Sequence, residues 1–244
     1  DSAYQQVNGA IGTDVVYNIG DVLLAYSLWQ ETADERYRYM RAYKRYMDRY
    51  FSYTVGTNDG IKPDGTGYHH WTAYNNYMYS FNTAAEIVSY LTGSAFQVEQ
   101  SSYKVFRDSF FTQFVQSNDY FFRGGVTGTQ RTGTQALSTA GRNPQTRSNP
   151  LSEDSFKRLA IAGGSILGLT TADPVLAGVF NRIFGVDAQF NSNAVTPFEG
   201  GFFQFNHAMA GLYRYENTKT LVFNKGFSNN MWGAEAYIDQ NRYG

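Results

Sequence analysis

The segment Thr32–Tyr53, TADERYRYMRAYKRYMDRYFSY, shows most clearly how this chain folds. Thr32 followed by Glu35 is a capping-box pattern, which predicts that a helix begins directly after Thr32. Tyrosines then recur every three or four residues, at 39, 43, 46, 50 and 53. Basic residues occupy the other faces, at 36, 38, 41, 44, 45 and 49. The pattern predicts an amphipathic helix to about Tyr53, with its tyrosine stripe in the core and its basic face in solvent.

Apolar residues at helical spacing also extend over much of the chain before residue 190. They predict helices at about 14–29, 79–91, 96–113 and 152–169, and a short helix after Pro174. The stretch 124–150 is rich in Gly, Thr, Ser, Gln and Arg, and such a long segment inside a domain is commonly functional or disordered. Paired antiparallel helices of this kind fit an α/α toroid or a helical array. A solenoid is disfavoured because the sequence has no fixed-period repeat.

After about Asn191 the pattern changes to short, aromatic-rich segments separated by polar turns, at 201–206, 210–215, 219–224 and 234–238. These predict an antiparallel β-meander and a domain boundary near residue 190. The fold class is therefore mainly α with a β portion. Because the β portion is too small for a complete sandwich and the chain lacks an initiator Met, we expect an excised fragment.

The composition and the missing motifs exclude several classes of function. A net charge of −1, from 20 basic and 21 acidic side chains, argues against a nucleic-acid partner. No apolar run is long enough to span a membrane. The first residues do not have the pattern of a signal peptide, so we expect any targeting signal to lie upstream of this fragment. The chain has no Cys, which excludes thiolate chemistry, and it lacks HExxH, GxSxG and GxxxxGK motifs. We therefore expect no metal and no cofactor. Aromatic residues reach 17%, which suits sugar binding, although an aromatic core explains them equally well.

The densest cluster of polar and aromatic residues is the segment 60–81, GIKPDGTGYHHWTAYNNYMYSF, which sits on a turn and leads into a helix. This segment resembles the active-site segment of the chondroitin and hyaluronate lyases of polysaccharide lyase family 8, especially the chondroitin ABC lyases. Two further matches follow in the expected order. AGRNP at 140–144 is similar to the family's arginine-bearing loop, and FFQFN at 202–206, NMWGAEAY at 230–237 and NRYG at 241–244 resemble the start of its β domain.

The resemblance implies an enzyme that cleaves chondroitin or dermatan sulfate by β-elimination and leaves unsaturated uronate ends, with hyaluronan as a further candidate substrate. It implies that residues 1–190 form the C-terminal half of an (α/α) toroid catalytic domain and that 191–244 form the first strands of a truncated β-sandwich. We expect a secreted or periplasmic monomer whose partner is the glycosaminoglycan. Elimination requires a group that removes the proton on carbon 5, a group that protonates the leaving oxygen, and stabilisation of the developing charge.

By this resemblance the catalytic residues are His70, Tyr77, Arg142 and Glu235. Tyr77 removes the proton and can return one to the leaving oxygen. A phenol has a reference pKa of about 10, and positive charge from Arg142 would lower it. His70 binds the carboxylate or assists proton transfer, and Glu235 holds Arg142 or His70 in position.

Other residues of these motifs have assigned or competing roles. The predicted substrate-binding residues are His69, Trp71, Tyr79, Asn143 and Arg147. Tyr79 is a rival base, because some family members place the tyrosine nine positions after the histidine rather than seven; we prefer Tyr77. Arg147 could share the task of Arg142. Ile11 stands near the position where chondroitin AC and hyaluronate lyases carry a carboxylate-neutralising Asn. This favours the ABC-like branch and leaves the neutralising group open, as His70 or an upstream residue.

Two alternatives compete with the lyase. A glycoside hydrolase on an α/α toroid needs two carboxylates, for which Asp59 and Asp64 are candidates, although both sit in turn signals where Asp is common. A non-catalytic glycan-binding protein on a lyase-like scaffold is the other, because fold does not imply activity.

Overall fold

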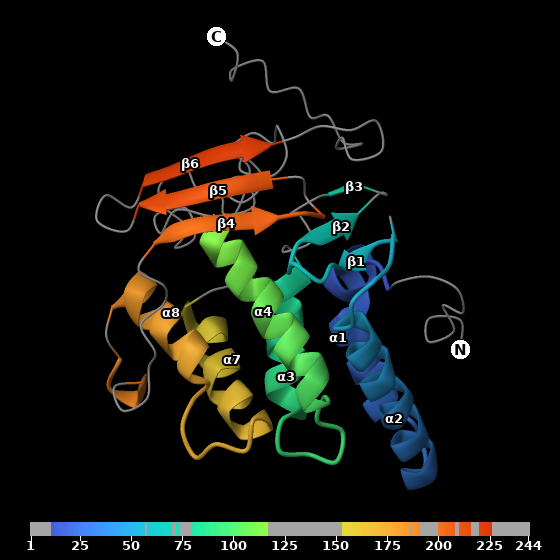
Figure 1. The fold of residues 1–244 in the computed structure, drawn as a ribbon. Coiled ribbons are helices and arrows are strands. Elements are labelled where there is room, and N and C mark those ends of the chain that lie inside the picture. The colour runs from blue at the N-terminus through green and yellow to red at the C-terminus, as the bar shows by residue number, and fades with distance from the viewer. Residues whose placement is uncertain are drawn as a thin grey trace.

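A computed structural model describes residues 11–56, 58–69, 72–73, 80–116, 153–185, 187–190, 200–207, 210–215 and 220–225. Within these residues the chain is mainly helical, as predicted, and has two small antiparallel sheets (Figure 1). The helices are α1 (Thr13–Leu28), α2 (Ala33–Tyr50), α3 (Phe81–Leu91), α4 (Gln100–Gln116), α7 (Glu153–Ile166) and α8 (Pro174–Phe184), followed by the short 3-10 helix η4 (Ala188–Phe190).

Helices α2 and α8 begin at residues whose side chains accept from free backbone N–H groups of the first turn. In α2 the Thr32 hydroxyl accepts from Glu35 N at 3.2 Å, while the Glu35 carboxylate accepts from Thr32 N at 3.1 Å. The predicted capping box is thus confirmed. In α8 the buried carboxylate of Asp173 accepts from the backbone N–H groups of Val175 and Leu176. Asp173 also accepts from the Tyr103 hydroxyl at 2.8 Å, which ties α8 to α4.

The tyrosine stripe of α2 is in the core over most of its length. Tyr43, Tyr46 and Tyr50 are buried, as predicted, and Tyr39 is half-buried against Tyr26. The prediction is wrong for Tyr53, whose side chain is 47% exposed. The helix ends at Tyr50, so the helical periodicity that would have turned Tyr53 inward stops before it.

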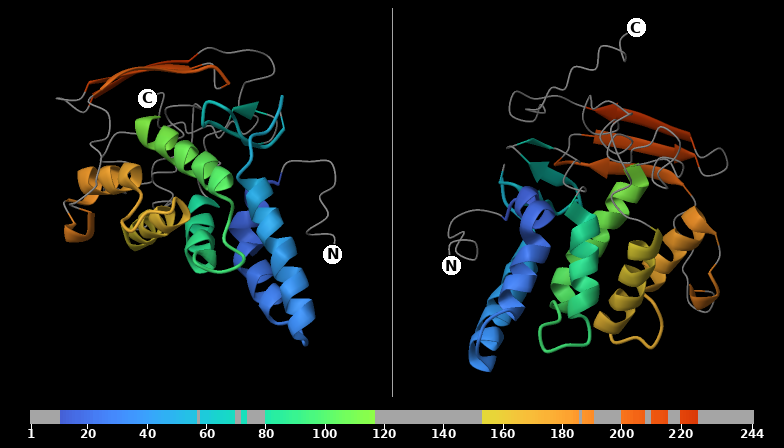
Figure 2. Two further views of the ribbon diagram at one scale, coloured as in Figure 1. Left: turned by 60° about the horizontal axis from the view of Figure 1, so that its bottom comes forward. Right: turned by 180° about the vertical axis from the view of Figure 1, so that it is seen from behind.

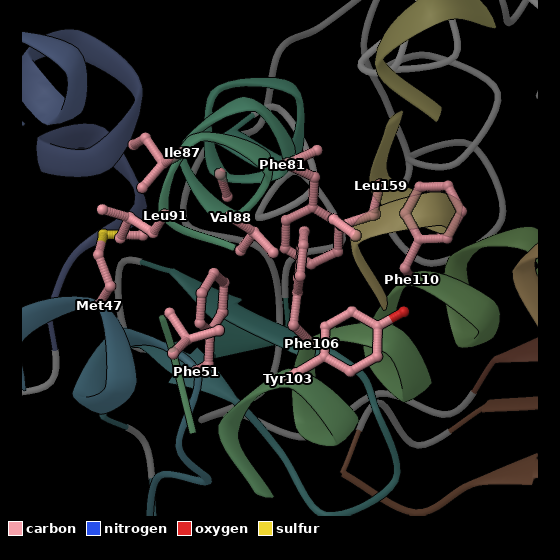
Figure 3. Packing of buried hydrophobic residues seen from close by; sticks show 14 of the residues in the cluster. Met47, Phe51, Phe81, Ile87, Val88, Leu91, Tyr103, Phe106, Phe110 and Leu159 are labelled. Carbon is pink, nitrogen blue, oxygen red and sulfur yellow. The ribbon is translucent and has the colours of Figure 1, made fainter. Parts of the chain in front are cut away.

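The helices lie side by side and bury one aromatic core. α3 packs between α1 and α7, α1 packs on α2, and α7 packs on α8. At the centre, Phe106 of α4 stacks on Phe51 at 4.5 Å between ring centroids and meets Phe81 edge-on at 4.9 Å (Figure 3). Offset and edge-on ring pairs of this kind add about 0.5–1.5 kcal/mol each beyond their area burial.

The two sheets lie at the same end of the helices (Figure 2). Strands β4 (Gly201–Phe205), β5 (Ala210–Tyr215) and β6 (Thr220–Lys225) form an antiparallel meander. In its backbone register Phe203 pairs with Leu212, and Leu212 pairs with Phe223. The first three predicted strands are thereby confirmed, and the fourth, at 234–238, lies outside the described residues. No helix in the described part of the chain is both long and apolar enough to cross a membrane.

The second sheet was not expected from the sequence, which indicated only turns before a helix. It consists of β1 (Gly60–Ile61), β2 (Gly67–His69) and β3 (Thr72–Ala73), in the order β1-β2-β3. Ile61 pairs with Gly67, and His69 pairs with Thr72. These strands are two or three residues long, too short for the period-two alternation that identifies a strand in a sequence.

Candidate active site

The structure places only one of the predicted site residues. His69 is the last residue of β2, and its backbone faces Thr72 at the start of β3. The remaining predicted site residues lie outside the described residues: His70, Trp71, Tyr77, Tyr79, Arg142, Asn143, Arg147 and Glu235. Their roles therefore stay predictions. What the structure does show is how the segment that carries the first four of them is anchored on either side.

The chain before His69 is held by a tight turn against α4. The Lys62 carbonyl accepts from Gly65 N at 2.8 Å, and Gly65 has a φ of +79°, which favours glycine. From α4, the Ser109 hydroxyl donates to the Gly65 carbonyl at 2.8 Å and Thr112 donates to the Asp64 carbonyl at 3.3 Å. The close approach also requires glycine, because a Cβ at position 65 would lie 2.1 Å from the Thr112 hydroxyl oxygen.

The Asp64 carboxylate joins this turn to the C-terminal sheet. It accepts from Thr66 N at 3.1 Å and from the Thr66 hydroxyl at 2.6 Å. It also accepts from the backbone N–H of His207 at 2.7 Å, and its distance to His207 Nδ1 is 3.3 Å. His207 lies two residues after the end of β4 and is 143 residues away from Asp64 in sequence. A carboxylate engaged in this way acts as a structural acceptor, which argues against Asp64 as a hydrolase acid.

Beneath the same turn lies a buried lysine. The Lys62 ammonium donates to the Thr54 hydroxyl at 2.9 Å and to the Asn58 carbonyl at 2.7 Å. Burial lowers the pKa of Lys62 to about 8, although the negative charges of Asp59 and Asp64 act in the opposite direction. The burial of Lys62 is not predictable from the sequence, because no spacing rule marks a lone lysine before a Pro-Asp-Gly turn as buried. The ammonium ties residues 54 and 58 to the strand that leads into the candidate site.

The chain after Tyr79 is held by hydroxyl groups. Ser80 is buried directly before α3. Its hydroxyl accepts from Thr13 of α1 at 2.6 Å and is hydrogen-bonded to the Tyr50 hydroxyl at the end of α2. The segment with His70 and Tyr77 therefore begins and ends on positions that are fixed to the helical layer.

Two further observations bear on the chemistry. Ile11 is buried in the hydrophobic core, where its side chain supplies packing and no polar group. Within the described residues, no cluster of three or more His, Asp or Glu side chains could hold a metal ion.

Comparison with known proteins settles the family. The family model described as "Lyase, catalytic" matches residues 11–189, more than half of the chain. The chain belongs to polysaccharide lyase family 8. The resemblance drawn from the sequence is thus confirmed. The matched range of the lyase family includes His70, Tyr77 and Arg142, whereas Glu235 lies beyond it.

A curated relative of this lyase family is the chondroitin sulfate ABC endolyase of Proteus vulgaris. It is 25% identical to this chain over 193 residues. The match covers 78% of this chain but 17% of the relative, so the chain spans less than a fifth of that protein's length.

Proposed function

We propose that the protein cleaves chondroitin or dermatan sulfate by β-elimination, giving unsaturated uronate ends, with hyaluronan as a further candidate substrate. The observation that carries this proposal is the match of residues 11–189 to the lyase catalytic domain. The relative named as a chondroitin sulfate endolyase supports the choice of polymer. The anchoring of Asp64 and Ser80 to the surrounding helices and sheet is consistent with it, because catalysis needs positions held to within a fraction of an ångström.

In the proposed reaction Tyr77 removes the proton from carbon 5 of the uronate, and the electron pair expels the glycosidic oxygen from carbon 4. The same phenol can then return a proton to that oxygen. Arg142 favours the phenolate and the developing negative charge, and His70 binds the carboxylate or assists proton transfer. Glu235 holds Arg142 or His70 in place. The remaining predicted residues bind the sugar chain: His69, Trp71, Tyr79, Asn143 and Arg147.

The proposal also includes the domain architecture. The paired helices would form the C-terminal half of an (α/α) toroid in residues 1–190, and strands β4–β6 would begin a β-sandwich in residues 191–244. We propose that the protein is secreted or periplasmic and acts as a monomer.

The decisive experiment incubates the full-length protein with chondroitin sulfate, dermatan sulfate and hyaluronan and follows the ultraviolet absorbance of unsaturated uronate. Tyr77→Phe removes the hydroxyl that transfers the proton and keeps the ring. Loss of a general acid–base group lowers kcat by about 10²–10⁴-fold. Tyr79→Phe is the matched control and should keep kcat close to that of the wild type, because Tyr79 is proposed to bind the sugar chain and not to transfer the proton.

Each contrary outcome would indicate a different catalytic base or a different function. Normal turnover by Tyr77→Phe with an inactive Tyr79→Phe would transfer the role of base to Tyr79. Products without a double bond would identify a hydrolase. Binding of the polymers without any product would identify a glycan-binding protein, and the proposed reaction would then be wrong.

A further inference from the structure

Four arginines line one face of α2. Arg38, Arg41, Arg45 and Arg49 are spaced by three, four and four residues, so they share one side of the helix. All four side chains are exposed. At 100° per residue they lie opposite the buried side of the helix, which is formed by Met40, Tyr43, Tyr46, Met47 and Tyr50. We name these four residues the arginine stripe.

The helix that carries the stripe has a net positive charge. α2 contains six basic and three acidic residues, whereas the whole chain has a net charge of −1. Glu35 is engaged in the capping box, and Asp48 accepts from Lys44. Across the described residues, no carboxylate forms an ion pair with Arg38, Arg41 or Arg45.

Neighbouring like charges are unfavourable at this spacing. Two arginines at i,i+3 or i,i+4 repel each other and weaken a helix. The stripe contains three such neighbouring pairs. A polyanion bound along the stripe would reduce this repulsion. A helix face that is only exposed to solvent more commonly carries charges of alternating sign.

The residue type also suits an anionic ligand. All members of the stripe are arginines, while the one lysine of the helix, Lys44, lies off the stripe and bridges Asp48 and Glu99. A guanidinium can present two parallel N–H groups to a carboxylate or sulfate, which an ammonium cannot. The Arg41 guanidinium lies 5.8 Å from the ring centroid of Tyr37, an exposed side chain that also packs against Phe96. This contact restrains Arg41 on the surface of the helix.

The position of the stripe relates it to the candidate active site. From Arg38 to Arg49 it extends about 17 Å along the helix axis, long enough to face several consecutive sugar rings. Its last member is one residue before the end of α2. Soon afterwards Tyr53 pairs with Ile61 of β1, in the sheet that carries His69 (Figure 1).

We infer that the arginine stripe is a second binding site for the sulfated or carboxylated sugar chain, separate from the site of cleavage. The identity of the polymer rests on the proposed function, whereas binding of a polyanion by the stripe does not. A long chain would contact both sites, while a short oligosaccharide bound at the site of cleavage would not reach the whole stripe. The stripe therefore increases affinity for polymer without changing the chemical step.

The test compares two charge-matched double variants of the full-length protein. Arg41→Gln/Arg45→Gln removes two charges from the stripe, and Lys104→Gln/Arg158→Gln removes two exposed charges from α4 and α7. Glutamine keeps helix propensity close to that of the original residues. For polymeric chondroitin sulfate at low salt, the stripe variant should show a KM raised about 3–10-fold with kcat unchanged. Its kinetics on a chondroitin tetrasaccharide should be those of the wild type, and salt should reduce the difference.

The control variant should match the wild type in every assay. An equal rise of KM in both variants would mean that only net charge matters, and an unchanged KM in the stripe variant would overturn the inference. If the wild type forms no unsaturated product, the proposed reaction fails separately. In that case the affinity of each variant for chondroitin sulfate polymer is measured directly. A loss of affinity in the stripe variant alone supports the second binding site, and equal affinities in both variants refute it.

Discussion

The buried ammonium of Lys62 makes the stability of the fold depend on pH in the alkaline range. The ammonium donates to the Thr54 hydroxyl and to the Asn58 carbonyl, neither of which carries a charge. The change to test is Lys62→Met, which keeps the length and apolar stem of the side chain and removes the titrating group.

The magnitude follows from the two pKa values of this amine. In the unfolded chain a lysine has a pKa of about 10.4, whereas burial lowers that of Lys62 to about 8 in the fold. Between these values the unfolded chain binds the proton more tightly, so the free energy of unfolding rises as the pH increases through this window. This increase in the free energy of unfolding is lost again as the pH falls through the pKa that Lys62 has in the folded protein. Integrated from about pH 7 to about pH 9.5, the contribution is about 2 kcal/mol.

The assay is urea unfolding of the wild type and Lys62→Met at pH steps across that range, followed by circular dichroism. The wild type should gain about 2 kcal/mol relative to Lys62→Met as the pH rises. Lys104→Met, which removes an exposed lysine of α4, is the matched control and should keep the wild-type profile. Parallel profiles of the wild type and Lys62→Met would show that burial does not change the proton affinity of this amine, and the reasoning would be wrong.

Two further predictions concern the turn before β2. Gly65→Ala should destabilise the protein by about 1–3 kcal/mol more than Gly93→Ala in urea unfolding, because both glycines have positive φ but only Gly65 faces a close neighbour, Thr112. Equal losses would mean that the backbone conformation alone is responsible. Asp64→Ala should lower the free energy of unfolding by about 1–3 kcal/mol more than Asp64→Asn, because the amide oxygen of Asn can still accept from His207 N. Urea unfolding measures both variants, and equal losses of stability would contradict a structural role for this acceptor.

Local signals in the sequence predicted most of the helical layer. The Thr32–Glu35 capping box and the spacing of the tyrosines located α2 to within a few residues, and the bounds of β5 were predicted as observed. These signals involve residues within one or two helical turns of each other, so they can be recognised in the sequence without knowledge of the fold. The same locality explains the error at Tyr53, since periodicity does not show where a helix ends.

The candidate site was predicted from residue motifs rather than from geometry. The family that these motifs indicated is confirmed by the match to residues 11–189. The arrangement of His70, Tyr77 and Arg142 stays a prediction. What the structure adds is the framework that holds this segment on the Asp64 turn and on Ser80.

By itself, then, the sequence determined the helices, the meander and the lyase family, because periodicity, capping and motifs are properties of neighbouring residues. Only the tertiary structure decided that Lys62 is buried, that β1–β3 form a sheet and that Asp64 meets His207 across 143 residues. The physical reason is that burial and long-range hydrogen bonds depend on which elements pack together. No short stretch of sequence contains that information.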